Sequence, residues 1–215
     1  RHLSAFGAVN ITGPKWYGKT WAAYNCCNSA TLIADPKGNY QIRRLAMTDP
    51  TLIFKDDLPQ LIDEWQDVPG IWDAVRYRVD DAGRKGMYVL TGSATPNREG
   101  FVHSGAGRIK ELRMRTMTLL ERGISDGRIS LKGLFDCPEF SLPTQDAELR
   151  DVIDYTVHGG WPGVKDMTVD ASLEVAKGYI ETLVNSDISF DGVNRDPAKM
   201  LRLIRSLARN ESTTA

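Results

Sequence analysis

The chain has 215 residues, a hydrophobic content of 41% and a net charge of −1 at neutral pH. This size allows one full core, or one core with a small second domain, and the charge gives no global basic bias toward nucleic acid. The three cysteines form neither a disulfide framework nor a zinc signature, so we expect reduced thiols in the cytoplasm. No apolar run is long enough to cross a membrane, and no signal-peptide pattern is present.

Residues 1 to about 120 alternate between short β-prone runs and helical patterns. Strands are predicted at 7–12, 31–34, 61–62, 86–91 and 109–114. One helix is predicted from Lys19 to Asn25 and another at 68–79, where Val68, Trp72, Val75 and Val79 share a face. Such alternation predicts an α/β fold with a parallel sheet.

The last third of the chain has helical patterns only. Helices are predicted at 145–157, where Gly159 and Gly160 follow as a stop, and at 169–185. Asp196 and Pro197 form a typical N-cap and first-turn pair for a third helix. A domain boundary is expected within 123–143, a stretch that contains proline and glycine.

The stretch GPKWYGKTW directly follows the first predicted strand and fits the P-loop spacing G-x-x-x-x-G-K-[ST]. In such a loop the backbone N–H groups curl around phosphate oxygens, and the following helix adds its positive dipole end. Lys19 would reach the β- and γ-phosphates, and Thr20 would offer its hydroxyl to Mg²⁺. The candidate nucleotide-binding residues are Gly13, Pro14, Lys15, Trp16, Tyr17, Gly18, Lys19, Thr20 and Trp21. The alternative is a glycine turn with a solvated lysine.

An acidic pair, Asp63 and Glu64, ends the third predicted strand. After a P-loop, this pair predicts a magnesium-holding carboxylate at Asp63, acting through water, and a catalytic carboxylate at Glu64 that polarises the attacking water. By itself such a pair would be a solvated strand end.

Two further elements are candidate catalytic groups. Thr91 or Ser93, at the end of the fourth predicted strand, could sense the nucleotide or orient the water, although a plain turn has the same composition. Arg108 follows Gly105-Ala106-Gly107 and could stabilise charge on a transferring phosphoryl group of a neighbouring subunit. The alternative for Arg108 is a basic surface patch or a contact to nucleic-acid phosphates.

The segments GPKWYGKT, LIDEWQDVP, YVLTGSA, GAGRIKELRM, HGGWPG and YIETLVNSDIS occur in this order along the chain. In this the chain resembles a group of prokaryotic AAA-superfamily ATP-binding proteins. The resemblance implies a three-layer P-loop NTPase domain of AAA type at 1–125, then a helical lid region at 126–215 whose end, from 196 to 209, begins a truncated winged-helix-like segment.

The resemblance also implies roles for single residues and a further domain. Glu64 matches the added acidic catalytic residue, Thr91 or Ser93 the sensor position, and Arg108 the arginine finger. A C-terminal domain of unknown function with a nuclease-like look is expected beyond residue 215, because the chain opens on Arg1 and stops in a polar tail.

Three functions are compatible with these residues. The first is an ATP-hydrolysing switch or motor that uses ATP and Mg²⁺, as a homo-oligomer if Arg108 acts across a subunit interface. The second is a nucleotide-dependent module that binds DNA or a protein with little hydrolysis, using the basic residues Arg108, Lys110, Arg113, Arg115 and Arg122. The third is a small-molecule kinase, which the Asp63–Glu64 pair disfavours.

Overall fold

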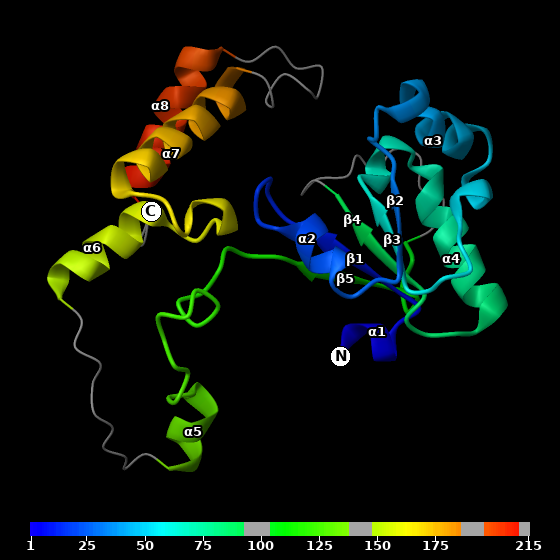
Figure 1. The fold of residues 1–215 in the computed structure, drawn as a ribbon, viewed down its shortest axis with the longest axis horizontal. Coiled ribbons are helices and arrows are strands. Elements are labelled where there is room, and N and C mark those ends of the chain that lie inside the picture. The colour runs from blue at the N-terminus through cyan, green and yellow to red at the C-terminus, as the bar shows by residue number, and fades with distance from the viewer. Residues whose placement is uncertain (93–103, 138–147, 186–195, 211–215) are drawn as a thin grey trace. The chain divides into compact units, whose positions relative to one another are not determined.

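The computed structural model describes residues 1–92, 104–137, 148–185 and 196–210. It divides into two compact units, Arg1–Glu121 and Arg122–Ala215, which are described separately below (Figure 1). Within the described ranges, no helix combines the length and the apolar character that crossing a bilayer requires.

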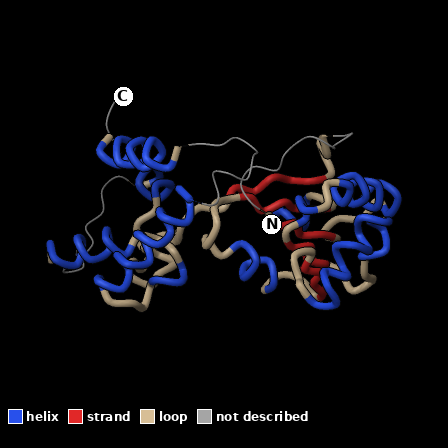
Figure 2. Tube along the Cα trace, turned by 90° about the horizontal axis from the view of Figure 1, so that it is seen from above, coloured by secondary structure: helices blue, strands red, loops and turns tan. Residues whose placement is uncertain are grey.

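The first unit is built around a five-stranded sheet, whose strands are drawn in red in Figure 2. Every pair of neighbouring strands is parallel, and the strand order is β2-β3-β4-β1-β5. The strands are β1 Ala8–Thr12, β2 Ser29–Leu32, β3 Gln60–Asp63, β4 Tyr88–Thr91 and β5 Ile109–Arg113. The helices are α1 His2–Ala5, α2 Lys19–Tyr24, α3 Lys37–Thr48 and α4 Gly70–Ala82, with short 3₁₀ turns η1 Pro50–Ile53 and η2 Trp65–Asp67. The predicted parallel α/β sheet is confirmed.

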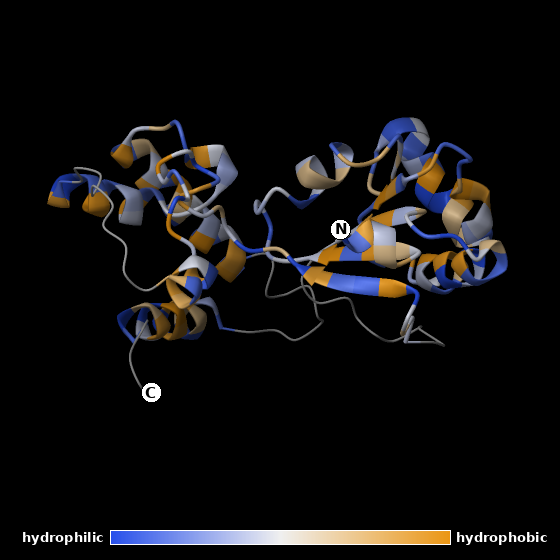
Figure 3. Cartoon of the chain, turned by 90° about the horizontal axis from the view of Figure 1, so that it is seen from below, coloured by the Kyte–Doolittle hydropathy of each residue, from blue (hydrophilic) through white to orange (hydrophobic). Residues whose placement is uncertain are grey.

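The sheet carries a separate apolar core on each face, because side chains alternate along each strand. On one face, Ala8, Ile62 and Leu90 pack with α3 and α4. On the other face, Val9, Ile11, Leu61 and Val89 pack with Ala23 of α2. The strands are therefore sandwiched between helices in three layers. The edge strand β5 is largely hydrophilic, and its Lys110, Glu111 and Arg113 are exposed (Figure 3).

Two sequence predictions need correction in this unit. The second strand spans Ser29–Leu32 rather than 31–34, because β2 pairs residue by residue with β3 and this pairing ends where Leu32 faces Asp63. Helix α3 was missed, since Lys37-Gly38-Asn39 indicates a turn. Gly38, Asn39 and Tyr40 do have positive φ values of 58°, 55° and 57°, and the helix that follows packs Ile42 and Ala46 into the core.

In its described residues the second unit contains helices and no strand, in agreement with the prediction. They are α5 Leu131–Asp136, α6 Leu149–His158, η3 Pro162–Val164, α7 Val169–Asn185 and α8 Pro197–Arg209. Helix α7 has the predicted bounds. Helix α8 is capped as predicted, with the Asp196 carboxylate accepting from the Ala198 amide at 2.8 Å.

His158 closes helix α6 through both of its ring nitrogens. Nδ1 lies 2.7 Å from the Asp154 carbonyl oxygen and Nε2 lies 2.8 Å from the Met167 carbonyl oxygen. A neutral imidazole has one N–H group, so only the protonated ring can donate to both carbonyls. The Met167 carbonyl and then the Asp154 carbonyl raise the pKa of His158, which the nearby Arg122 guanidinium partly opposes.

We predict that His158 stabilises the second unit at acidic pH. Because its pKa in the folded state is raised, the contribution is complete below the unfolded-state value of about 6.5 and is lost as the pH rises through the folded-state value. Denaturant unfolding should therefore show a larger difference between the unmodified chain and His158→Gln at pH 5.5 than at pH 8.5. His2→Gln, in the exposed helix α1, is the control, and a difference that does not change with pH would contradict the prediction.

Candidate functional site

The polar residues that the sequence singles out gather where three neighbouring strands end. Strand β4 lies between β3 and β1, and Thr91 at its end faces Asp63 on one side and Ile11 on the other. The loop that follows Thr12 therefore starts beside Thr91 and Asp63. In open α/β sheets, ligands bind at this carboxyl edge.

The loop after β1 has a backbone that requires glycine at its ends. Gly13 and Gly18 have φ values of 149° and 87°, and a Cβ atom on Gly13 would lie 2.9 Å from the backbone oxygen of Met114. Trp16 has a φ of 68°, which is uncommon for a residue with a side chain and is typical of functional loops.

Lys19 extends back over this loop. Its Nζ donates to the carbonyl oxygens of Gly13 at 2.8 Å and Pro14 at 2.9 Å, and the residue is only 8% exposed. Burial lowers the pKa of Lys19, while the carboxylates of Glu64 and then Asp63 act to raise it. The ammonium group thus lies in a buried place beside both predicted carboxylates.

Asp63 connects the loop to the sheet. Its Oδ1 accepts a hydrogen bond from the Thr20 hydroxyl at 3.0 Å and a second one from the Thr91 hydroxyl. Hydroxyl and carboxylate oxygens are the hard donors that Mg²⁺ prefers, so Thr20 and Asp63 fit this ion chemically. The described residues contain no group of three or more His, Cys, Asp or Glu side chains that could hold a metal.

Glu64 leaves strand β3 in a left-handed conformation, with φ 54° and ψ 42°. Its Oε2 accepts a hydrogen bond from Nε2 of Gln66, two residues further on. Gln66 was not predicted as a site residue. The feature of the sequence that could have indicated it is a polar amide two residues after a predicted catalytic carboxylate.

The turn after Glu64 is anchored in the core by Trp65, which is 1% exposed. Its indole Nε1 donates to Oδ1 of the buried Asn10 at 3.1 Å, and its ring packs on Trp72 with centroids 5.0 Å apart. Both tryptophans belong to the core. Asn10 was not predicted as a partner, although an asparagine within the apolar run of β1 signals a buried hydrogen bond.

The remaining predicted residues lie in different surroundings. Thr91 is fully buried and is engaged with Asp63, while Ser93 lies outside the described residues. Lys15 is exposed and Tyr17 is half-buried. Trp16 is 53% exposed and Trp21, on α2, is 73% exposed.

Arg108 lies at the amino-terminal ends of the parallel strands, whereas the loop after β1 lies at their carboxyl ends. It directly precedes β5, and its carbonyl oxygen accepts from the amide of Ala8, at the start of β1. The loop leaves the other end of β1, a strand length of roughly 13 Å away at about 3.3 Å per residue. Arg108 therefore does not meet the loop of its own chain.

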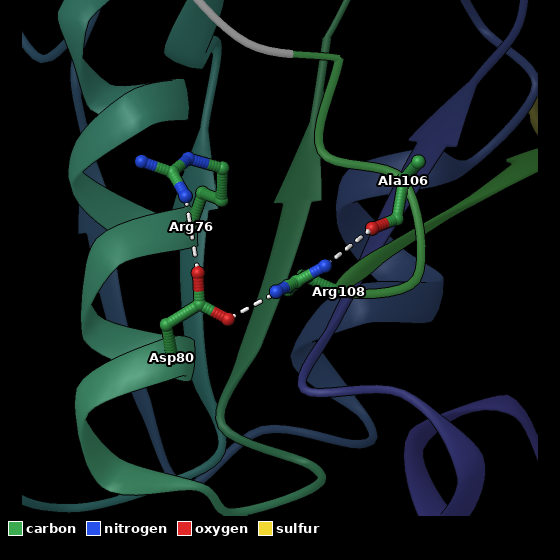
Figure 4. A network of polar contacts seen from close by, with 4 residues as sticks. All are labelled: Arg76, Asp80, Ala106 and Arg108. Atoms are coloured by element: carbon green, nitrogen blue, oxygen red, sulfur yellow. Dashed lines mark hydrogen bonds and ion pairs between the residues drawn. The ribbon is translucent and has the colours of Figure 1, made fainter.

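The Arg108 guanidinium is held in a polar network on α4 (Figure 4). Its Nε donates to Asp80 at 2.7 Å and its Nη1 to the Ala106 carbonyl at 3.2 Å, while Arg76 binds the other oxygen of Asp80 at 3.0 Å. The hydrogen bond from Arg108 lowers the pKa of Asp80.

The five basic residues of the predicted cluster lie in different surroundings, and Arg115 is exposed after the end of β5. Arg108 is paired with Asp80, whereas Lys110 and Arg113 are exposed on the edge strand β5. Arg122 belongs to the second unit, where it donates to the Gly159 carbonyl at 2.9 Å and lies over the Tyr155 ring.

The profile of a protein family described as "AAA domain" matches residues 5–122, which is more than half of the chain. The chain belongs to the AAA domain family. Its first unit is accordingly an AAA-type, ATPase-like module, and the loop and the strand ends described above lie within the matched residues.

A second profile, described as a domain of unknown function (DUF8612), matches residues 149–215. A domain of unknown function thus follows the AAA domain within the chain, at residues 149–215. The sequence-based prediction had placed such a domain beyond residue 215. A comparison with curated proteins finds no match.

Proposed function

We propose that this AAA domain binds ATP with Mg²⁺ and hydrolyses it to ADP and phosphate, as a cytoplasmic switch or motor. The observation that carries the proposal is the meeting of Lys19 and Thr20 with Asp63 and Glu64 at one sheet edge. The free cysteines Cys26, Cys27 and Cys137 agree with a reducing compartment.

Binding is assigned to the loop from Gly13 to Thr20. Its backbone N–H groups would surround the phosphates, and Lys19 would exchange its two carbonyl partners for phosphate oxygens. Thr20 and Asp63 would hold the metal, which when bound neutralises charge on the β- and γ-phosphates. Trp16, Tyr17 and Trp21 would pack around the nucleotide.

Hydrolysis is assigned to Glu64. Its carboxylate would accept a proton from a water whose oxygen attacks the γ-phosphorus, while the bond from that phosphorus to the bridging oxygen breaks and ADP leaves. Thr91 would keep Asp63 in place, and Ser93 is proposed as a second sensor of the γ-phosphate.

Stabilisation of the negative charge on the transferring phosphoryl group is assigned to Arg108 of a neighbouring copy of the chain. Arg108 lies at the sheet edge opposite its own loop, so it can serve a phosphate site only across an interface. This assignment implies a homo-oligomer. The contacts of the basic residues give no specific support to the DNA-binding alternative. That alternative predicts that the chain binds ATP but hydrolyses little of it.

We predict that Lys19→Ala lowers the affinity for Mg-ATP by about 10- to 100-fold, because charge-assisted hydrogen bonds to phosphate are lost. Isothermal titration calorimetry measures this directly. Lys37→Ala is the matched control, since the Lys37 side chain is 90% exposed in a turn. Equal affinity in both variants would contradict the role of the loop.

Glu64→Gln should retain Mg-ATP binding and lose about 10²- to 10⁴-fold in kcat, since the amide cannot accept the proton from water. Phosphate release under saturating ATP is the readout. Glu174→Gln, exposed on α7, is the control. Phosphate release at the unmodified rate would remove Glu64 from its proposed role.

Arg108→Ala should lower kcat by about 10-fold or more while the chain still binds Mg-ATP. Mixing Arg108→Ala with Glu64→Gln should restore part of the activity, because one copy then supplies the intact site and the other the arginine. Arg84→Ala, an exposed arginine, is the control. A mixture no more active than its separate components would argue against action between copies.

A further inference from the structure

We infer that Gln66 is a positioning residue that fixes the carboxylate of Glu64, and that Gly92 is a glycine because the Gln66 amide occupies the space beside it. The inference rests on the proposed role of Glu64 in hydrolysis. It is carried by three independent features of the described residues: the turn after β3, the Gln66–Glu64 hydrogen bond and the contact at Gly92.

The turn brings the amide to the carboxylate. The left-handed backbone of Glu64 starts the 3₁₀ turn η2, in which the Asp67 amide donates to the Glu64 carbonyl at 3.1 Å. The Val68 amide then donates to the Trp65 carbonyl at 3.0 Å. Because the Trp65 side chain is buried and hydrogen-bonded to Asn10, this turn is fixed to the core.

The hydrogen bond defines which way the Gln66 amide faces. Its Nε2 donates to Oε2 of Glu64, since an amide oxygen turned toward a carboxylate would be repelled. One carboxylate oxygen of Glu64 is thereby held, and Oε1 is left to accept from water. A general base acts well only when its geometry is fixed in this way.

The other end of the amide lies against strand β4. A Cβ atom on Gly92 would lie 2.1 Å from Oε1 and 3.0 Å from Cδ of Gln66. The next nearest atom, Nε1 of Trp65, is at an ordinary distance of 3.5 Å. Among the atoms nearest to such a Cβ, those of the Gln66 amide are the ones that would have to move, so alanine at position 92 would displace the amide from its place beside Glu64.

This arrangement is costly in stability. Oε1 of Gln66 is buried and accepts no hydrogen bond from the described residues, and a buried unsatisfied oxygen is destabilising. A residue selected for stability alone would not leave this atom unpaired. The cost is understandable if the amide is needed to hold Glu64.

Gln66→Leu, which keeps the volume and removes the donor, tests the positioning. We expect kcat to fall about 10-fold or more, while the KM for ATP and the calorimetric affinity for Mg-ATP stay within about twofold. Gln41→Leu, an exposed glutamine on α3, is the matched control. An unchanged kcat in Gln66→Leu with normal ATP binding would overturn the inference and leave the proposed function intact.

A double-mutant cycle on the melting temperature, without nucleotide, tests the contact at Gly92 independently of activity. Gly92→Ala alone should lower Tm by about 4 °C or more, whereas in the Gln66→Ala background it should change Tm by less than about 1 °C. An equal loss in both backgrounds would overturn the contact. If neither the unmodified chain nor any variant binds a nucleotide, the proposed function is wrong, and so is the role of Gln66 in it. The double-mutant cycle still shows whether Gln66 and position 92 are in contact.

Discussion

One carboxylate oxygen connects the parts of this site. Oδ1 of Asp63 accepts hydrogen bonds from Thr20, in the first turn of α2 after the loop, and from Thr91, at the end of β4. The ends of three neighbouring strands are thereby connected at one point, close enough for the carboxylates of Glu64 and Asp63 to act on the pKa of Lys19. The parallel order β3-β4-β1 makes this possible, since in an antiparallel sheet these ends would alternate between edges.

Several features of the site lower the stability of the folded domain. Lys19 keeps an ammonium group in a buried place, Glu64 and Trp16 have left-handed backbones, and a buried oxygen of Gln66 accepts no hydrogen bond within the part of the chain that the structure describes. Beneath them lie two apolar cores in which Ile62, Leu90 and Val89 are almost completely buried. Each such side chain contributes roughly 1.5–3 kcal/mol by burial, which offsets the local strain.

Local sequence patterns were sufficient for the sheet and the loop. Apolar runs predicted β1, β3 and β4, and the glycine spacing predicted a loop whose Gly13 and Gly18 have positive φ. The end of β2 could not be predicted, because it depends on where β3 ends. Asn10 was missed because its partner Trp65 is 55 residues away in the sequence. Gln66 was missed because no sequence pattern predicts the left-handed turn at Glu64 that brings the amide back to the carboxylate. Arg108 lies away from its own loop because β1 and β5 are parallel, and Arg108 precedes one strand whereas the loop follows the other.

The central claim is that the edge formed by Gly13–Thr20 and Asp63 accepts a triphosphate together with a divalent cation. Calorimetric titration of the whole chain with ATP, in the presence and in the absence of Mg²⁺, tests it most directly. The account predicts one site per chain and a clear loss of affinity when the cation is withheld. Absence of binding with every nucleoside triphosphate, even with Mg²⁺ supplied, would contradict it.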